Sequence, residues 1–303
     1  MEKTLDVGPP RPGMGLDVLR WALATCDGGQ RVVVASVVTT SGSVPGKAGA
    51  RLALSSGPTW KGTVGGAGLE ERVKAAMLER LDAPGRPMGT VLTYGLHRGA
   101  KGYEVVALDS LCGGRVTVSI DVLHPTPHVL LMGGGHCAVA FAHLAQQLGW
   151  RTSVQDSREA YAGMEQHPAA VERHVSSVEG FLQREDAHTL RRFTDILLLG
   201  HDHAEDRARL HGLLERFVAA KEVPGEGGTP RVGCIGSRAK WTSFRDGCIE
   251  SGLPETVVEA VVCPIGLNIG AETPEEIAVA VAAAIMASQA GLSPGEPTWR
   301  DAL

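Results

Sequence analysis

The glycine-rich segment at residues 133–138 constrains the fold more than any other feature of this sequence. It reads Gly-Gly-Gly-His-Cys-Ala and fits the pattern G-x-G-x-x-G/A. An apolar, strand-like run precedes it at 129–132, a helical pattern follows at 138–148, and a second strand-like run follows at 152–155. Strand, glycine turn, helix and strand in this order indicate a parallel βαβ unit of the Rossmann dinucleotide-binding type.

Each position of this pattern has an expected role. Gly133 allows the tight turn, Gly135 lets a pyrophosphate approach the backbone closely, and Ala138 permits close helix packing. Asp156 ends the next strand and is expected to accept a hydrogen bond from a ribose hydroxyl, which favours NAD over NADP. The alternative is a Rossmann-shaped domain that binds a different dinucleotide or none.

The length of 303 residues indicates two domains with separate cores. Residues 1–15 are rich in Gly and Pro and are expected to form a flexible tail. We predict an α/β chain with an N-terminal α+β domain at 16–124 and a C-terminal Rossmann-like domain with a parallel sheet at 128–303. The boundary is expected at His-Pro-Thr-Pro-His, 124–128, because proline restricts itself and the residue before it.

Hydrophobic periodicity predicts the remaining elements of both domains. In the first domain we expect helices at 16–25 and 69–81, and strands at 31–39, 51–54, 89–93, 103–108 and 115–123. In the second domain we expect further strands at 196–199, 231–235 and 261–263, each followed by a helix. The last helix, 275–287, is predicted to begin with Thr273 as its N-cap, Pro274 at N1 and Glu276 at N3.

Composition narrows the function classes. The net charge of −5 arises from interspersed acids and bases without a long basic run, so we expect no nucleic-acid partner. The longest apolar stretch, 277–287, is too short to span a bilayer, and a cytoplasmic location without membrane contact is expected. Six cysteines occur without a CxxC pair or zinc spacing, so no metal site is predicted.

Histidines follow two of the predicted strands. His136 lies where the glycine turn meets its helix, and its ring either faces a ligand or is an exposed loop side chain. His201 and His203 follow the strand at 196–199, and the carboxyl ends of parallel strands form the ligand crevice. Alternatively, Asp202 with Glu205 three residues later only caps a helix. Metal binding is disfavoured because no third ligand is evident.

Two further turns carry candidate residues. Gly236, Ser237, Arg238 and Lys240 follow the strand at 231–235 and offer free amides, a hydroxyl and two cations at a helix start, an arrangement that binds anions. Alternatively, Ser237 is a simple N-cap and the two cations are solvated. The turn-rich run at 263–270 is either a corner of the scaffold or a lid over the ligand.

These segments, taken in order, resemble the xanthine dehydrogenase accessory proteins of the XdhC/CoxI type over residues 16–287. The resemblance rests on Gly-Thr-Val-Gly-Gly at 62–66 with Leu69-Glu70, Cys112-Gly113-Gly114, Gly-Gly-Gly-His at 133–136, Asp156 with Arg158, His201-Asp202-His203, Gly236-Ser237-Arg238, and Cys-Pro-Ile-Gly-Leu-Asn-Ile-Gly at 263–270. It implies a family-specific N-terminal domain followed by a Rossmann domain.

The resemblance also implies a function. Members of this family are associated with binding molybdenum cofactor (molybdopterin), promoting its sulfuration by a cysteine desulfurase, and delivering it to a molybdenum hydroxylase such as xanthine dehydrogenase. Many members carry a cysteine directly after the double glycine of the first-domain motif, whereas this chain has Ala67 and Gly68. The thiols embedded in the motifs here are therefore Cys112 and Cys263.

Two functional hypotheses follow. The first is a maturation factor that binds molybdenum cofactor and passes it on, using the turns at 133–135 and 236–240 for the pterin phosphate. The second is an NAD(P)-dependent oxidoreductase of a small metabolite, in which Glu70, His201 or His203 accepts the proton that accompanies hydride transfer. A homodimer is expected in either case from the general prevalence of dimers.

Overall fold

The computed structural model describes residues 14–57, 59–83, 85–96, 105–107 and 113–292. The predicted tail at 1–15 falls almost wholly outside them, as does Cys112. The chain forms two compact units, Met1–Pro125 and Thr126–Leu303. The division falls within the proline-containing segment, where neither proline can donate a backbone hydrogen bond.

The first domain is built on a six-stranded sheet in the order β3-β2-β1-β6-β4-β5. All neighbouring strands are antiparallel except β4 and β5. The predicted helices and strands are present, although only residues 105–107 of the strand predicted at 103–108 are among the described residues, and β3 is an additional short strand. The elements are α1 (Met14–Asp27), β1 (Val32–Ser41), β2 (Arg51–Ser55), β3 (Trp60–Gly62), α2 (Ala67–Asp82), β4 (Thr90–Gly95), β5 (Val105–Ala107) and β6 (Arg115–Leu123).

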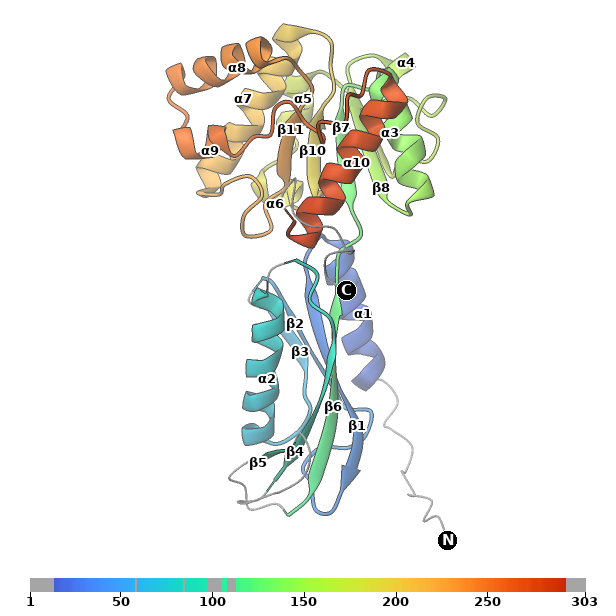
Figure 1. Cartoon of the computed structure of the whole chain (residues 1–303), viewed down its shortest axis with the longest axis vertical. Helices are drawn as coiled ribbons and strands as arrows, with labels where there is room; N and C mark the ends of the chain where they lie inside the picture. Colours follow the sequence, from blue (N-terminus) through green and yellow to red (C-terminus); the bar gives the residue numbers. More distant parts are fainter. Residues whose placement is uncertain (1–13, 58, 84, 97–104, 108–112, 293–303) are drawn as a thin grey trace. The chain divides into compact units, whose positions relative to one another are not determined.

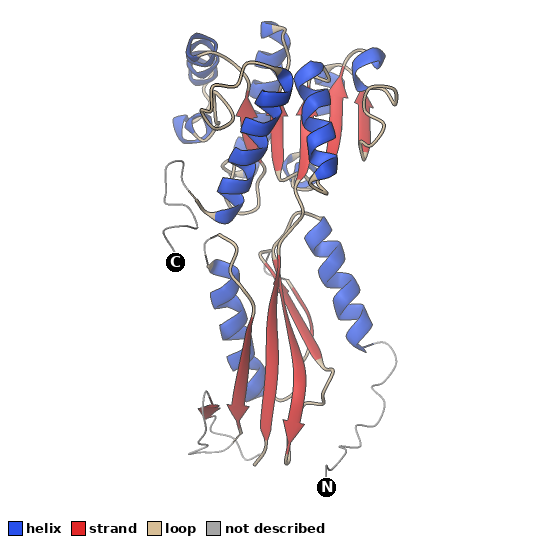
Figure 2. Cartoon of the chain, turned by 45° about the vertical axis from the view of Figure 1, so that its right-hand side comes forward, coloured by secondary structure: helices blue, strands red, loops and turns tan. Residues whose placement is uncertain are grey.

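Alternation along the central strand β1 places a helix on each face of this sheet. Val33, on one face, belongs to a core cluster with residues of α2. Val32 and Val34, on the other face, belong to a second cluster with residues of α1. Figure 2 shows the two helices on opposite sides of the strands. This two-faced burial explains why β1 is apolar almost throughout its first half.

The second domain contains a five-stranded, fully parallel sheet in the order β11-β10-β7-β8-β9. Its strands are β7 (His128–Met132), β8 (Arg151–Asp156), β9 (Glu172–Val175), β10 (Asp195–Leu198) and β11 (Arg231–Cys234). Read from β9, the order is third, second, first, fourth and fifth strand along the chain. This is the strand order of the Rossmann fold, as the glycine turn predicted.

Helices cover both faces of this sheet (Figure 1). One core cluster joins Leu131 of β7 to α3 (His136–Gln147) and α10 (Pro274–Ala290), which lie side by side. The other joins Leu130 of β7 to the helices α5 (Val178–Leu182), α7 (His203–Ala220), α8 (Arg238–Glu250) and α9 (Glu255–Glu259). Adjacent residues of β7 thus pack into opposite cores, and β7 and β10 are apolar after their first residue. The central strand β8 is instead largely polar, although it is buried.

Most predicted elements of the second domain are confirmed, with two kinds of difference. Short elements without a clear period were not predicted: β9, α4 (Glu159–Ala162), α5, α6 (Ala187–Leu190) and α9. The predicted strand at 261–263 is wrong, because only Val262 forms a bridge, to Gly233, and no helix follows directly. The run lies beside β11 and exchanges backbone hydrogen bonds with it only around this bridge. Thr273 and Glu276 form the predicted capping box of α10.

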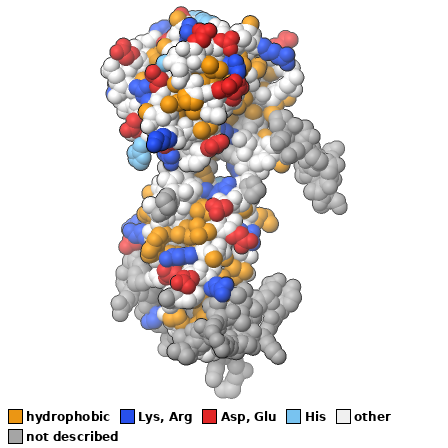
Figure 3. All heavy atoms as spheres, turned by 90° about the vertical axis from the view of Figure 1, so that its left-hand side faces the viewer, with side chains coloured by type: hydrophobic (Ala, Val, Ile, Leu, Met, Phe, Trp, Pro, Cys, Tyr) orange, Lys and Arg blue, Asp and Glu red, His pale blue; other side chains and the backbone are white. Residues whose placement is uncertain are grey.

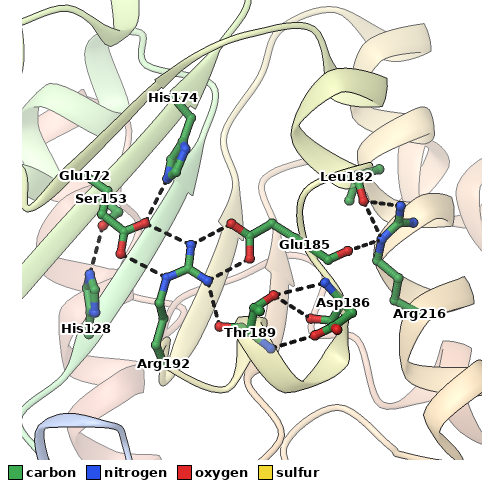
Figure 4. A network of polar contacts seen from close by, with 10 residues as sticks. All are labelled: His128, Ser153, Glu172, His174, Leu182, Glu185, Asp186, Thr189, Arg192 and Arg216. Carbon is green, nitrogen blue, oxygen red and sulfur yellow. Dashed lines mark hydrogen bonds and ion pairs between the residues drawn. The ribbon is translucent and has the colours of Figure 1, made fainter.

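An ion-pair network ties the amino ends of the strands together (Figure 4). Arg192, which precedes β10, donates two hydrogen bonds to each of two carboxylates, Glu172 at the start of β9 and Glu185, over 2.7–2.9 Å. The hydrogen bond from His174 and the Arg192 guanidinium lower the pKa of Glu172. His128, the first residue of β7, is buried and contacts Ser153 Oγ at 2.8 Å. Because it lies at the amino edge, we assign this network to stability.

On the face seen in Figure 3, acidic and basic side chains of the second domain are interspersed. The described part of this face therefore carries no large patch of a single charge sign. Within the described ranges, no helix combines the length and apolarity needed to cross a membrane.

Candidate functional site

The carboxyl edge of the second-domain sheet gathers the predicted site turns. The chain leaves β7 toward β8 on one side, whereas β10 joins β7 on the other, so the strand order reverses between β7 and β10. In open parallel sheets, ligands bind outside the carboxyl ends of the strands at such a switch point. The turns after β7, β10 and β11 all open on this edge.

Gly133 and Gly134 are required by the packing of the protein itself. Gly133 has φ 101°, and a Cβ there would lie 2.7 Å from the Gly200 nitrogen in the turn after β10. A Cβ on Gly134 would lie 1.8 Å from the Tyr161 carbonyl oxygen. The Gly134 carbonyl lies 3.2 Å from Nε2 of His167, which is buried. Burial lowers the pKa of His167, so its ring is neutral at pH 7 and Nε2 carries the proton.

Gly135 differs from its two neighbours because the protein does not require it. Its φ of −72° suits any residue, and a Cβ built there meets nothing within 4 Å. Gly135 is the N-cap of α3, where no side chain caps the free amides. The first turn of a helix carries unpaired N–H groups and a partial positive charge. The structure therefore leaves an open, donor-rich space where an anionic group fits against bare backbone.

Asp156 is wholly buried and accepts hydrogen bonds only from the protein. Its Oδ2 accepts from the Gly134 amide at 3.0 Å, and Oδ1 accepts from the Arg158 amide at 3.0 Å. The Arg158 guanidinium donates to both oxygens, at 2.8 and 2.9 Å. Burial alone would raise the pKa of Asp156, but these hydrogen bonds outweigh it and lower that pKa. The carboxylate holds the glycine turn in place, and the structure leaves no face of it open for the expected ribose hydroxyl.

Arg158 is a cation that this edge presents to solvent. Its side chain is 41% exposed, and its guanidinium carbon lies 3.8 Å from the centroid of the Tyr161 ring. The bidentate contact with Asp156 and the stacking on Tyr161 fix its orientation. Sequence reasoning cited Arg158 only as part of a motif. The signal that identifies it is a cation two residues after the acid that ends β8.

The predicted histidines lie at this edge and are exposed. His136 is the first residue of α3, and His201 lies in the turn after β10. His203 begins α7, and its ring packs edge-on against Phe244 with centroids 4.6 Å apart. Asp202 caps α7 by accepting from the Glu205 amide at 2.8 Å, as its spacing predicts. None of these histidines contacts a carboxylate that would orient it as a base, among the contacts described.

A buried charge cluster lies beneath these turns, and sequence reasoning missed it. Asp206 is fully buried and pairs with Arg209 at 2.9 Å and with Lys240 at 2.8 Å. Arg209, also fully buried, reaches Gln155 of β8 at 3.2 Å. A Cβ on Gly200 would lie 2.2 Å from Asp206 Oδ1, which explains that glycine. The available signal was an acid four residues before the buried Leu210 on the apolar face of α7.

This cluster changes the role of the turn at 236–240. Lys240 Nζ is held by Asp206 and by the Ile235 carbonyl at 3.1 Å, so it is not a free anion-binding cation. Ser237 accepts from the Lys240 amide at 3.2 Å and is the N-cap of α8. Arg238 is exposed, and Gly236 packs against the Lys240 side chain. The turn matches the simple N-cap alternative, except that Lys240 is paired rather than solvated.

The candidate base of the first domain is held by two partners. The carboxylate of Glu70 accepts from the Thr63 hydroxyl and forms an ion pair with Lys74 at 2.9 Å. Burial raises the pKa of Glu70, but the hydrogen bonds from Thr63 and Lys74 lower it overall. The Thr63 oxygen in turn accepts from the Gly65 amide at 3.1 Å. Glu70 thus ties the glycine turn at 62–66 to α2.

Comparisons with known proteins match both domains. A family model described as "XdhC Rossmann domain" matches residues 129–285, and one described as "XdhC and CoxI family" matches residues 26–95. The uncharacterized protein YqeB of Escherichia coli (strain K12) is 30% identical over 253 residues, which is 84% of this chain but 42% of that protein. The chain thus spans less than half the length of this relative.

A solved structure is also similar. It is described as a xanthine dehydrogenase (BH1974) from Bacillus halodurans, is 16% identical and aligns with a TM-score of 0.45 over 96% of this chain and all of that one. The family assignment rests on the sequence models, the first of which covers more than half of the chain. The ordered motifs and the two family models agree, and the chain belongs to the XdhC family.

Proposed function

We propose that this protein is a maturation factor that binds molybdenum cofactor as cargo and assists its sulfuration and its insertion into a molybdenum hydroxylase such as xanthine dehydrogenase. Membership of the XdhC family, whose members are associated with these steps, supports this role. The client hydroxylase and a cysteine desulfurase are the partners that this role requires.

The observation that carries the binding part of the proposal is the open space at Gly135. The protein needs Gly133 and Gly134 for its own packing but gains nothing from the missing side chain at 135. A phosphate placed there would meet the free amides at the start of α3, which is 12 residues long. The phosphate arm of the pterin fits this chemistry, and Arg158 supplies a fixed positive charge on the same edge.

A second function has support from the same turn, because a Rossmann strand order with an intact G-x-G-x-x-A pattern suits NAD(P). In that case the protein would be an oxidoreductase. The engagement of Asp156 by Gly134 and Arg158 weakens this alternative, since the acid that would select a ribose hydroxyl has no free lone pair directed outward.

The test is titration of the purified full chain with isolated molybdenum cofactor, NADH and NADPH, followed by fluorescence. The Cβ of a Gly135→Val variant enters the open space and meets nothing within 4 Å. Because valine is a poorer N-cap than glycine, we expect a fall in stability of about 1 kcal/mol together with at least a tenfold weaker affinity, or about 1.4 kcal/mol. Gln147→Val, exposed at the other end of α3, is the matched control and should bind normally.

The outcomes separate the two functions. Binding of molybdenum cofactor that is lost in Gly135→Val supports the maturation role. Binding of NADH or NADPH alone, lost in the same variant, supports the oxidoreductase. Binding of molybdenum cofactor that survives Gly135→Val would show that the glycine turn is not its site.

A further inference from the structure

Two cysteines from separate segments meet at the carboxyl end of β11. Cys234 is the last residue of that strand, and Cys263 follows Val262, which forms a parallel bridge with Gly233. The Cys234 amide donates to the Val262 carbonyl at 2.9 Å, and Ile265 donates to the Cys234 carbonyl at 3.1 Å. Cys234 and Cys263 are therefore adjacent register positions, each one residue beyond the bridge.

This register suits a disulfide. Paired backbones lie about 4.8 Å apart, and disulfides join residues whose Cα atoms are roughly 4.4–6.8 Å apart. Residues that share a register position present their side chains on the same face of the sheet. The two thiols interact through a hydrogen bond, and both are free. Cys234 is buried, whereas Cys263 is only partly buried and is the more accessible thiol.

A cation lies beside the pair. Cys234 Sγ lies 3.4 Å from the Ile235 carbonyl oxygen, and Lys240 Nζ donates to the same oxygen at 3.1 Å. The hydrogen bond from Cys234, with the positive charge of Lys240, lowers the pKa of Cys263. The same hydrogen bond, together with burial, raises the pKa of Cys234. The accessible thiol is thus the better nucleophile, and the buried one retains its proton.

The other described cysteines lack this arrangement. Burial raises the pKa values of Cys26, Cys137 and Cys248, and nearby acids raise those of Cys26 and Cys137 further. None of the three has a second thiol among its described contacts. The difference between Cys263 and the similarly half-buried Cys137 gives an internal comparison for any reactivity measurement.

We propose that Cys234 and Cys263 form a reversible, redox-active dithiol that a low-molecular-weight disulfide oxidises, with Cys263 as the attacking thiol and Cys234 as the resolving thiol. In the first step the Cys263 thiolate attacks one sulfur of the small disulfide, whose S–S bond breaks and releases one thiolate. In the second step Cys234 loses its proton and attacks Cys263 Sγ, which releases the second thiolate. One small disulfide is reduced to two thiols, and the protein gains one disulfide.

This dithiol site is independent of the cargo proposed above. The bond would join the end of β11 to the turn-rich segment that begins at Cys263, on the carboxyl edge of the sheet. Oxidation would therefore tether this segment at the edge where ligands of the Rossmann fold bind.

The experiment uses the full chain, reduced and then incubated with oxidised glutathione, followed by alkylation of free thiols and peptide mass mapping. We expect a Cys234–Cys263 linkage that dithiothreitol reverses. Cys234→Ser should stop the reaction at a glutathione adduct on Cys263, and Cys263→Ser should abolish both products. Cys248→Ser is the matched control and should oxidise like the wild-type chain.

Alkylation rates test the proposal without any cysteine substitution. Cys263 should be alkylated faster than Cys137 in the native protein. Lys240→Met should raise the pKa of Cys263 and slow its alkylation, roughly threefold for each unit by which the pKa rises, because a smaller thiolate fraction is partly offset by a more nucleophilic thiolate. Three results would overturn the proposal. They are a linkage between other cysteines, the lack of an adduct on Cys263 in both Cys234→Ser and Cys234→Ala, and equal alkylation rates of Cys263 and Cys137.

Discussion

Removing the carboxylate of Asp156 should unfold the glycine turn and not merely weaken the binding of a ligand. In Asp156→Ala, the buried amide of Gly134 and the partly buried amide of Arg158 each lose a charged acceptor, and such hydrogen bonds contribute about 1.5–3 kcal/mol each. The Arg158 side chain is 41% exposed and its guanidinium regains hydrogen bonds to water, so the loss of its ion pair with Asp156 adds little to the destabilisation. The expected destabilisation is roughly 4 kcal/mol, and about half of that for Asp156→Asn, which retains one acceptor oxygen.

The assay is thermal and urea unfolding of the full chain, with hydrogen exchange of the peptide that contains Gly134. For a domain of this size, about 4 kcal/mol corresponds to a fall in Tm of roughly 8–16 °C in the transition of the second domain. Asp202→Asn is the matched control, because asparagine caps a helix as well as aspartate does, and it should change stability by less than about 0.5 kcal/mol.

The pH dependence provides a second check on Asp156. Its pKa in the folded protein is lowered below the unfolded value of about 3.9. The stabilisation is therefore complete above that value and is lost as the pH falls through the folded-state pKa. The difference between wild type and Asp156→Asn should shrink in strong acid. The reasoning is refuted if Asp156→Asn leaves unfolding and exchange at Gly134 unchanged while abolishing dinucleotide binding, since the carboxylate would then serve the ligand.

Three further predictions concern the scaffold. Gly134→Ala should destabilise the second domain by about 1–3 kcal/mol in urea unfolding, because its Cβ meets the Tyr161 carbonyl; unchanged stability would contradict the packing role. Burial lowers the pKa of His128 to about 4, so the neutral ring stabilises the fold fully at and above pH 6.5. Acidification from pH 6.5 through pH 4 should therefore destabilise the wild type by roughly 3 kcal/mol more than His128→Gln. Parallel pH profiles of the two proteins would exclude this role. Arg192→Lys should lower the Tm by roughly 4–8 °C, since lysine cannot make bidentate contacts with two carboxylates, and a loss under 1 °C would show that the network contributes little.

Local patterns in the sequence determined most of the architecture. The period-two alternation of strands, the glycine turn and the capping residues Asp202 and Thr273 act over a few neighbouring residues, so the chain itself displays them. The short elements β9, α5 and α6 could not be found this way, because one turn of helix or four residues of strand show no period.

The site divides along the same line. The sequence by itself determined where the glycine turn lies and that a helix N-terminus faces the carboxyl edge of a parallel sheet. Only the tertiary structure decided that Asp156 serves the turn, that Lys240 pairs with Asp206, and that Cys234 meets Cys263. These partners come from different strands and helices, so their pairing depends on the strand order and packing that bring distant segments together, which no local spacing specifies.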